Sequence, residues 1–152
     1  RPELNIAQLM SAIEALEAHD ALQCKLSLEE WKLAAPYLSI RFINTGDVLM
    51  TEGEQSRELF ILAEGALEVK IQTTVVATLK AGMVVGEGTF FSGHQRSATV
   101  VASAPGVAWA LSWDKFEAMS RQHPRVALDL CRSIAAVMAV RMREAILVGH
   151  FA

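Results

Sequence analysis

Three hydrophobic patterns follow one another along the chain. Between residues 4 and about 22, apolar residues such as Ile6 and Leu9 recur at spacings of three and four, which predicts an amphipathic helix. A second, short helix is indicated by "SLEEWKLAAPYL", in which Ser27 and Glu30 form a capping box and the proline marks the end. The first part of the chain is therefore expected to be helical.

After Leu38 the pattern changes to short β-branched and aliphatic runs separated by turn residues. The runs are "IRFI", "DVLMT", "LFILA", "ALEVKI", "VVATL", "SATVVA" and "VAWALS". Seven or eight short strands at this spacing predict a β-sandwich, jelly roll or barrel. The helical period returns at Trp113 with "WDKFEAMSRQ", breaks at "HP", and continues as a long helix over residues 125–148. The expected order is helices, β-roll, helices.

Composition narrows the class of protein. The 152 residues suit one domain, and 52% hydrophobic and 20% charged residues indicate a globular chain. A net charge of −3 argues against a basic nucleic-acid-binding face. The two cysteines and four histidines are scattered, which predicts no disulfide framework and no metal site. We expect a cytoplasmic setting, and the first residue, Arg1, suggests a piece of a longer polypeptide.

Segment 84–102, "VVGEGTFFSGHQRSATVVA", concentrates the candidate chemistry. Gly86 and Gly88 allow close approach of a ligand or of another backbone segment. Arg96 offers a planar fork for phosphate oxygens, and Glu87 could accept hydrogen bonds from a sugar hydroxyl. The alternative is a structural ion pair at the base of a surface loop. The residues alone leave both interpretations open.

The segment resembles the phosphate-binding cassette of the cyclic-nucleotide-binding domain family, which includes the bacterial catabolite activator protein and the regulatory subunits of cyclic-AMP-dependent kinase. The shared motif is Gly-Glu, a small residue two positions further on, and then Arg followed by a small residue and Ala. Upstream, "NTGDVLMTEGEQSRELFILAEGALEVKI" matches the glycine positions of the same family. The resemblance extends over roughly residues 24–147.

This resemblance implies an α+β fold, an eight-stranded antiparallel β-roll of the jelly-roll type flanked by N-terminal and C-terminal helices. Residues 1–23 would form an N-terminal amphipathic helix and linker. Residues 24–148 would form the cyclic-nucleotide-binding domain, with residues 125–148 as its lid helix.

The resemblance also implies roles for individual residues. Glu87 would accept from the ribose 2′-hydroxyl, beside Gly86. The amides of Gly88 and Thr89 would meet the phosphate, which Arg96 would neutralise. Valines would form an apolar wall beside the purine and sugar, and a lid residue would come from the last helix. The predicted ligand-binding residues are Val69, Val76, Val85, Gly86, Glu87, Gly88, Thr89, Arg96, Ser97, Ala98 and Arg141.

The last helix carries its apolar residues at spacings of three and four, and this stripe should dock on the β-roll or on a twin helix. It comprises Ala127, Leu130, Ile134, Val137, Ala145 and Val148. Arg141 falls within the same seam, where its stem could extend to solvent or its guanidinium could stack on the purine. Arg143 is the neighbouring candidate for the lid.

Some positions depart from the family pattern. Gly88 stands where an aliphatic residue is usual, and Gln95 replaces a frequent proline. Both departures concern the rigidity of the cassette, whereas Glu87 and Arg96 are kept.

The sequence therefore predicts a regulatory, non-enzymatic sensor of a cyclic purine mononucleotide, cAMP in the first place and cGMP in the second, that moves its C-terminal helix on binding. The alternative is a degenerate structural or interaction domain of the same fold. Expected partners are a parent effector domain or a membrane transporter, since segment 83–112 also resembles the C-terminal domain of some bacterial sulfate-permease-type transporters. A homodimer through the last helix is a further expectation, and direct DNA binding by this chain is not expected.

Overall fold

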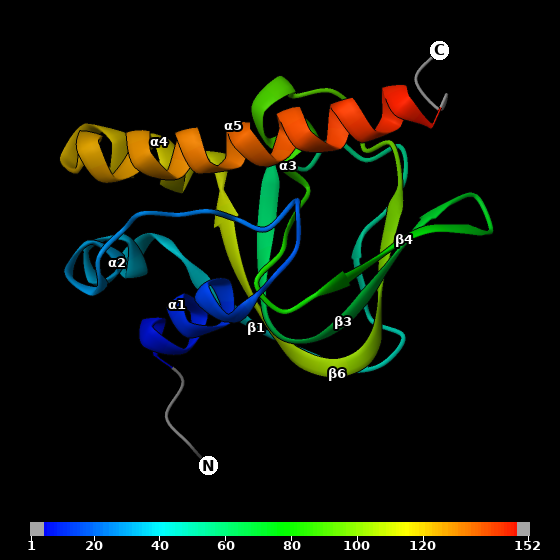
Figure 1. The fold of residues 1–152 in the computed structure, drawn as a ribbon, viewed down its shortest axis with the longest axis horizontal. Helices are drawn as coiled ribbons and strands as arrows, with labels where there is room; N and C mark the ends of the chain where they lie inside the picture. Colours follow the sequence, from blue (N-terminus) through cyan, green and yellow to red (C-terminus); the bar gives the residue numbers. More distant parts are fainter. Residues whose placement is uncertain (1–4, 149–152) are drawn as a thin grey trace.

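One antiparallel sheet curls into a roll, with helices at two places around it. The computed structural model describes residues 5–148. Helices α1 (Ile6–Ala15) and α2 (Leu28–Ala34) lie beside the roll, and the long helix α5 (Pro124–Leu147) runs across one end of it (Figure 1). The C-terminal half of α5 extends past α3 (Glu87–Ser92), the short helix that follows β5. This arrangement confirms the predicted helix, β-roll, helix order.

The sheet has six strands in the described part of the chain, in the order β1-β6-β3-β4, with β2 paired to β6 and β5 paired to β3. The strands are β1 (Ser39–Ile43), β2 (Val48–Met50), β3 (Glu58–Ile71), β4 (Thr74–Lys80), β5 (Val84–Val85) and β6 (Thr99–Ser112).

The strand count differs from the predicted eight because two strands are unusually long. The runs "LFILA" and "ALEVKI" lie in one 14-residue strand, β3, and "SATVVA" and "VAWALS" lie in another, β6. The β3–β6 pairing shifts register between Leu62 and Leu67, so the ladder bends without ending. Each of these two long strands therefore corresponds to two of the predicted strands.

Helix α1 is shorter than its hydrophobic pattern predicts. It begins after Asn5, whose side chain accepts from the Ala7 amide at 3.0 Å, and ends at Ala15 and not near residue 22. Beyond it the chain runs irregularly to α2, which lets Leu22 and Leu26 enter the core at 1% and 3% exposure. Burial of these two side chains outweighs the helical propensity of the segment.

The other helices begin and end close to where the sequence places them. Ser27 and Glu30 form the predicted capping box of α2, and a short 3₁₀ helix (Ala35–Tyr37) containing Pro36 follows it. Helix α4 (Trp113–Gln122) has the predicted bounds, with the Ser112 side chain accepting from the Lys115 amide. Local capping chemistry is strong enough at these termini to set the boundary.

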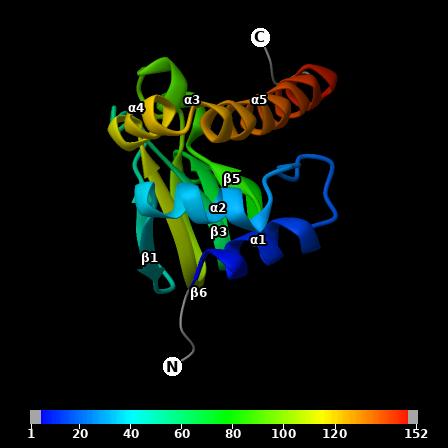
Figure 2. The ribbon, with the colours of Figure 1, turned by 90° about the vertical axis from the view of Figure 1, so that its left-hand side faces the viewer.

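The core divides into two clusters on opposite faces of the sheet. On β3, Leu59 and Ile61 pack with the helices, whereas Phe60 and Leu62 face the inside of the roll. This alternation follows from the two-residue period of a strand. In Figure 2, α1 and α2 lie in front of the sheet and cover this first face. The second face borders the candidate site.

Helix α5 docks through the predicted stripe over its first four turns. Ala127, Leu130, Ile134 and Val137 are each at most 3% exposed, whereas Val148 is 62% exposed. The apolar stripe therefore packs on the body of the protein only along the first part of α5. Within residues 5–148, no helix has the length and hydrophobicity that crossing a membrane requires.

Candidate functional site

Helix α3 is connected to β5 by a glycine that no other residue could replace without strain. Gly86 has φ +86°, and a Cβ at this position would lie 2.8 Å from Arg96 Nη1 and 2.8 Å from Met50 Cε. It would also lie 3.0 Å from the carbonyl oxygen of Glu58. The absence of a side chain lets the Arg96 guanidinium pack directly on the turn that begins α3.

The far end of α3 is held by Arg57. Its Nε and Nη2 donate to the carbonyl oxygens of Phe90 and Phe91, each at 3.0 Å, and its guanidinium lies 3.9 Å from the ring centroid of Trp113. Trp113 is the first residue of α4, so this cation–π contact connects α3 to the helices that follow the sheet.

Arg96 is buried at the base of the site, with only 4% of its surface exposed. Its Nη1 donates to the Gly86 carbonyl at 2.8 Å, and its Nη2 donates to the Glu58 carbonyl. Burial lowers the pKa of Arg96, while the carboxylates of Glu58, Glu87 and Glu54 act in the opposite direction. The Nε atom is buried and has no hydrogen-bond partner. The structure thus holds a cation in place and leaves part of its donor capacity unused.

A second arginine reaches the same place from α5. Arg141 Nη1 donates to Glu87 Oε1 at 2.8 Å, and Arg141 Nε donates to Asp20 Oδ2 at 3.1 Å. The exposed fractions are 24% for the Arg141 side chain, 15% for Glu87 and 13% for Asp20. Both the Nη2 atom of Arg141 and the Oε2 atom of Glu87 are buried without a partner.

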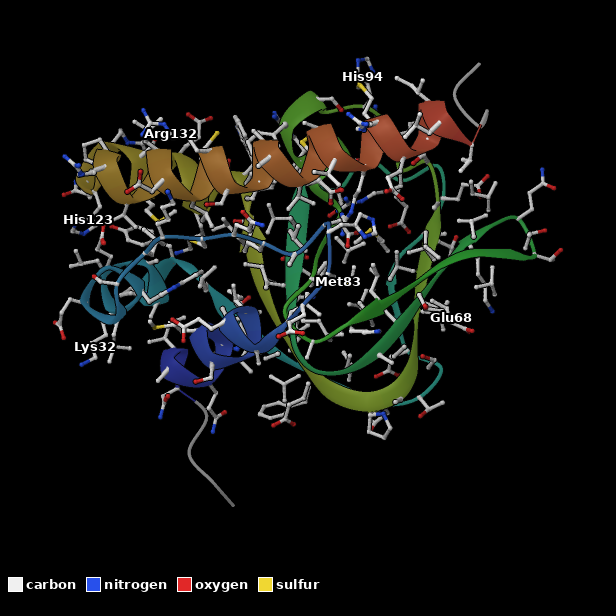
Figure 3. All side chains as sticks on the ribbon, in the orientation of Figure 1. Lys32, Glu68, Met83, His94, His123 and Arg132 are labelled. Carbon is white, nitrogen blue, oxygen red and sulfur yellow. The ribbon has the colours of Figure 1, made fainter. Side chains whose placement is uncertain are left out.

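These charged groups border one cavity of about 360 Å³. Its apolar wall comes from the inner face of the roll and includes Met83, which is labelled in Figure 3. A depression of about 460 Å³ beside α1 is lined by seven residues, none of them lysine or arginine, so it offers no cationic side chain to an anion. The smaller cavity is the candidate site because it combines buried cations, carboxylates and an apolar wall.

Residues 40–123 match the family model described as the cyclic nucleotide-binding domain. The matched region contains both Glu87 and Arg96. The chain belongs to the cyclic-nucleotide-binding domain family.

Relatives of this family differ in what the domain is joined to. Glutaminase 1 of Bradyrhizobium diazoefficiens is 33% identical over 118 residues, which cover 77% of this chain and 19% of that protein. The cyclic AMP receptor protein of Thermus thermophilus is 30% identical over 125 residues, 79% of this chain and 56% of that protein. The chain thus spans about a fifth of the length of the glutaminase.

Solved structures support the same fold. A cyclic nucleotide-binding domain from Methylobacillus flagellatus KT superposes with a TM-score of 0.80 at 22% identity, covering 92% of this chain and 79% of that one. At this identity the likeness establishes the β-roll fold with its flanking helices, and nothing finer.

The structure brings the predicted site residues of this family domain together around the cavity, with one exception. The residues that line it are Val69, Val85, Gly86, Glu87, Gly88, Thr89, Arg96, Ser97, Ala98 and Arg141. Val76 does not line it and is 52% exposed. The pairs Val69–Ala77 and Lys70–Val75 leave Val76 without a partner in a β-bulge, which removes it from the inner face.

Other lining residues were missed by sequence reasoning. They are Asp20, Met50, Ala77, Thr78, Leu79, Met83 and Val100. Ala77, Thr78 and Leu79 lie on β4, and a correct register for this strand would have placed them beside the cavity. Asp20 has no such signal, because it comes from the irregular segment before α2. His94, within the cassette, is exposed and does not border the cavity (Figure 3).

Proposed function

We propose that the cavity binds a cyclic purine mononucleotide, with cAMP as the ligand, and that the domain is a regulatory sensor. The observation that carries the proposal is the set of unpartnered polar atoms. Within residues 5–148, the buried side-chain atoms that have no hydrogen-bond partner are Glu87 Oε2, Arg96 Nε and Arg141 Nη2. All three side chains line this one cavity.

Buried polar atoms without partners are costly, so their concentration in one place indicates a missing ligand. The set comprises two cationic donors and one anionic acceptor, which suits a ligand with an anionic group and a hydroxyl group. A cyclic phosphate joined to a ribose has both. In this proposal Arg96 neutralises the phosphate, and Glu87 accepts from the ribose 2′-hydroxyl.

The apolar wall accounts for the third part of such a ligand. Val69, Leu79, Met83 and Val85 border the same cavity as the charged groups. Burial of a purine against such side chains is favourable by about 25 cal/mol per Å² of apolar surface. The choice of cAMP is supported by the resemblance of this chain to the cyclic AMP receptor protein of Thermus thermophilus over 79% of its length.

We further propose that binding is coupled to α5, because Arg141 is the cavity residue that this helix contributes. A ligand that satisfies Arg141 Nη2 favours the position of α5 in which this side chain lies over the cavity. The output would be an effector in the same polypeptide, as the length of the glutaminase relative suggests. A transporter parent and a homodimer through α5 stay predictions.

Isothermal titration calorimetry with cAMP, cGMP and cyclic di-GMP tests the proposal. We expect the wild-type chain to bind cAMP, and Arg96→Ala to weaken binding at least tenfold, or about 1.4 kcal/mol. Arg132→Ala is a matched control, since Arg132 is 71% exposed and lies away from the cavity (Figure 3). It should leave the affinity unchanged.

If none of the three nucleotides releases heat at millimolar concentration, the sensor proposal is wrong. The domain would then be a structural or interaction module that keeps the fold without the ligand. Binding of cGMP but not cAMP would keep the class of ligand and correct the base.

A further inference from the structure

Two polar side chains of the irregular segment between α1 and α2 contact the C-terminal half of α5. Asp20 Oδ2 accepts from Arg141 Nε at 3.1 Å, and His19 Nε2 lies 3.3 Å from Glu144 Oε2. Figures 1 and 2 both show this segment rising from α1 to the underside of α5. Asp20 lines the cavity and is 13% exposed, whereas the His19 side chain is 63% exposed and does not border the cavity.

Asp20 gives Arg141 a second anchor. Glu87 alone would hold the guanidinium by one hydrogen bond at Nη1, about which the group could swing. With Asp20 bonded to Nε, two carboxylates from different elements fix the plane of the guanidinium. The remaining nitrogen, Nη2, is thereby placed and left without a partner.

Two unpartnered atoms therefore adjoin the same hydrogen bond. Arg141 Nη2 shares its carbon with Nη1, and Glu87 Oε2 shares its carbon with Oε1, while Nη1 and Oε1 lie 2.8 Å apart. One atom is a donor and the other an acceptor. A hydroxyl group can donate to a carboxylate and accept from a guanidinium at the same time, so one hydroxyl could satisfy both atoms.

We propose that Asp20 is a positioning residue of the nucleotide site, which holds Arg141 so that Arg141 Nη2 and Glu87 Oε2 together bind the ribose 2′-hydroxyl. This inference rests on the proposed function. It makes the segment before α2 part of the site, although this segment lies outside the family match at residues 40–123. It also assigns Arg141 to the ribose, whereas the sequence left two alternatives open, extension of the side chain to solvent and the stacking on the purine that the family resemblance implies.

The test compares two ligands that differ only in this hydroxyl, cAMP and 2′-deoxy-cAMP, on the full chain. Asp20→Ala should raise the dissociation constant for cAMP about tenfold, within the range for residues in direct contact. It should change the constant for 2′-deoxy-cAMP little, because that ligand lacks the group on which Asp20 acts. The double variant with Arg141→Ala should bind cAMP no more weakly than Arg141→Ala alone.

Two further variants separate positioning from a general structural effect. Asp20→Asn keeps an oxygen for Arg141 Nε and should recover part of the affinity. His19→Ala removes the neighbouring contact to α5 outside the cavity and should leave both constants within about twofold. Circular dichroism and urea unfolding establish that each variant is folded.

The inference is overturned if Asp20→Ala weakens both ligands equally, or if its effect adds fully to that of Arg141→Ala. If the wild type and Asp20→Ala bind cAMP with the same affinity, this inference is overturned while the proposed function stands. If the wild type binds neither ligand, the proposed function fails and this inference fails with it.

Discussion

Replacement of Gly86 by alanine tests how closely the site is packed. The methyl group would lie 2.8 Å from Arg96 Nη1 and 3.0 Å from the Glu58 carbonyl oxygen, at a backbone φ of +86°. The third neighbour, Met50 Cε, is the end of a flexible side chain and can move at little cost. Nη1 cannot move without weakening its hydrogen bond to the Gly86 carbonyl, and the Glu58 oxygen belongs to the backbone of β3.

The expected loss of stability has two parts. An alanine in the left-handed region costs about 1–2 kcal/mol, and a methyl group forced into a filled space costs about 1–3 kcal/mol. Alanine also lowers the conformational entropy of the unfolded chain, which offsets about 0.4–1 kcal/mol of this destabilisation. We therefore expect Gly86→Ala to lower the free energy of unfolding by about 1–4.6 kcal/mol.

Gly46 provides a matched control for this measurement. Its φ is +93°, but a Cβ there would have no atom within 4 Å, so Gly46→Ala carries the backbone cost alone. Urea unfolding of the two variants and the wild type, at equal m-values, separates the two parts. We also expect Gly86→Ala, and not Gly46→Ala, to weaken cAMP binding, because it displaces Arg96. Equal destabilisation by the two substitutions would refute the proposed packing of Arg96 on Gly86.

Three other predictions follow from single contacts. Gly88→Ala should fit in the ligand-free protein, because nothing lies within 4 Å of the added Cβ, and should stabilise it by about 0.5–1 kcal/mol in urea unfolding. A loss of stability would contradict the open space around this Cβ. Arg57→Ala should destabilise the protein by about 2–3 kcal/mol and change the fluorescence of Trp113, because it removes two hydrogen bonds and a cation–π contact. The exposed control Arg132→Ala should change neither the stability nor the fluorescence. Burial raises the pKa of the Cys24 thiol in the folded protein, so on raising the pH the unfolded chain loses this proton before the folded protein does. The free energy of unfolding should therefore decrease as the pH rises above about 8.5, the ordinary pKa of a thiol. A Cys24→Ala variant should show less of this alkaline loss in urea unfolding, and identical pH profiles would contradict it.

The fold could be predicted where local chemistry decides the structure. The capping box at Ser27 and the Ser112 cap set helix boundaries that the sequence pattern places correctly. The strand count could not be predicted in the same way. Whether a ladder bends or ends between Leu62 and Leu67 depends on pairing with β6, a strand more than 30 residues away. Register shifts of this kind leave no mark on the local hydrophobic pattern.

The charged part of the site was more predictable than its walls. Glu87 and Arg96 are close in sequence, carry opposite charges and lie near glycines; the residues alone left a pocket and a structural ion pair open, and the family resemblance favoured the pocket. Val76 was expected on the wall, but a bulge takes it out of register. Asp20 was expected on a helix reaching residue 22, and nothing nearby in the sequence shows that α1 ends at Ala15.

The division of labour within the site follows from where each charge comes from. Arg96 hydrogen-bonds to two backbone carbonyls inside the family match, so its position is fixed by the roll itself and does not depend on α5. Arg141 is fixed only by side chains, one from the cassette and one from the segment before α2. A contact between two side chains can be broken by a rotamer change of either partner, whereas the carbonyl partners of Arg96 are held by the backbone of the roll. In the proposed site, the part that would bind the phosphate is therefore preformed, and the contact at Arg141 is the part that we expect a ligand to shift. If the proposed function holds, a ligand lacking the ribose hydroxyl should occupy the first part and have little effect on the second, so that binding and the proposed movement of α5 could be measured separately.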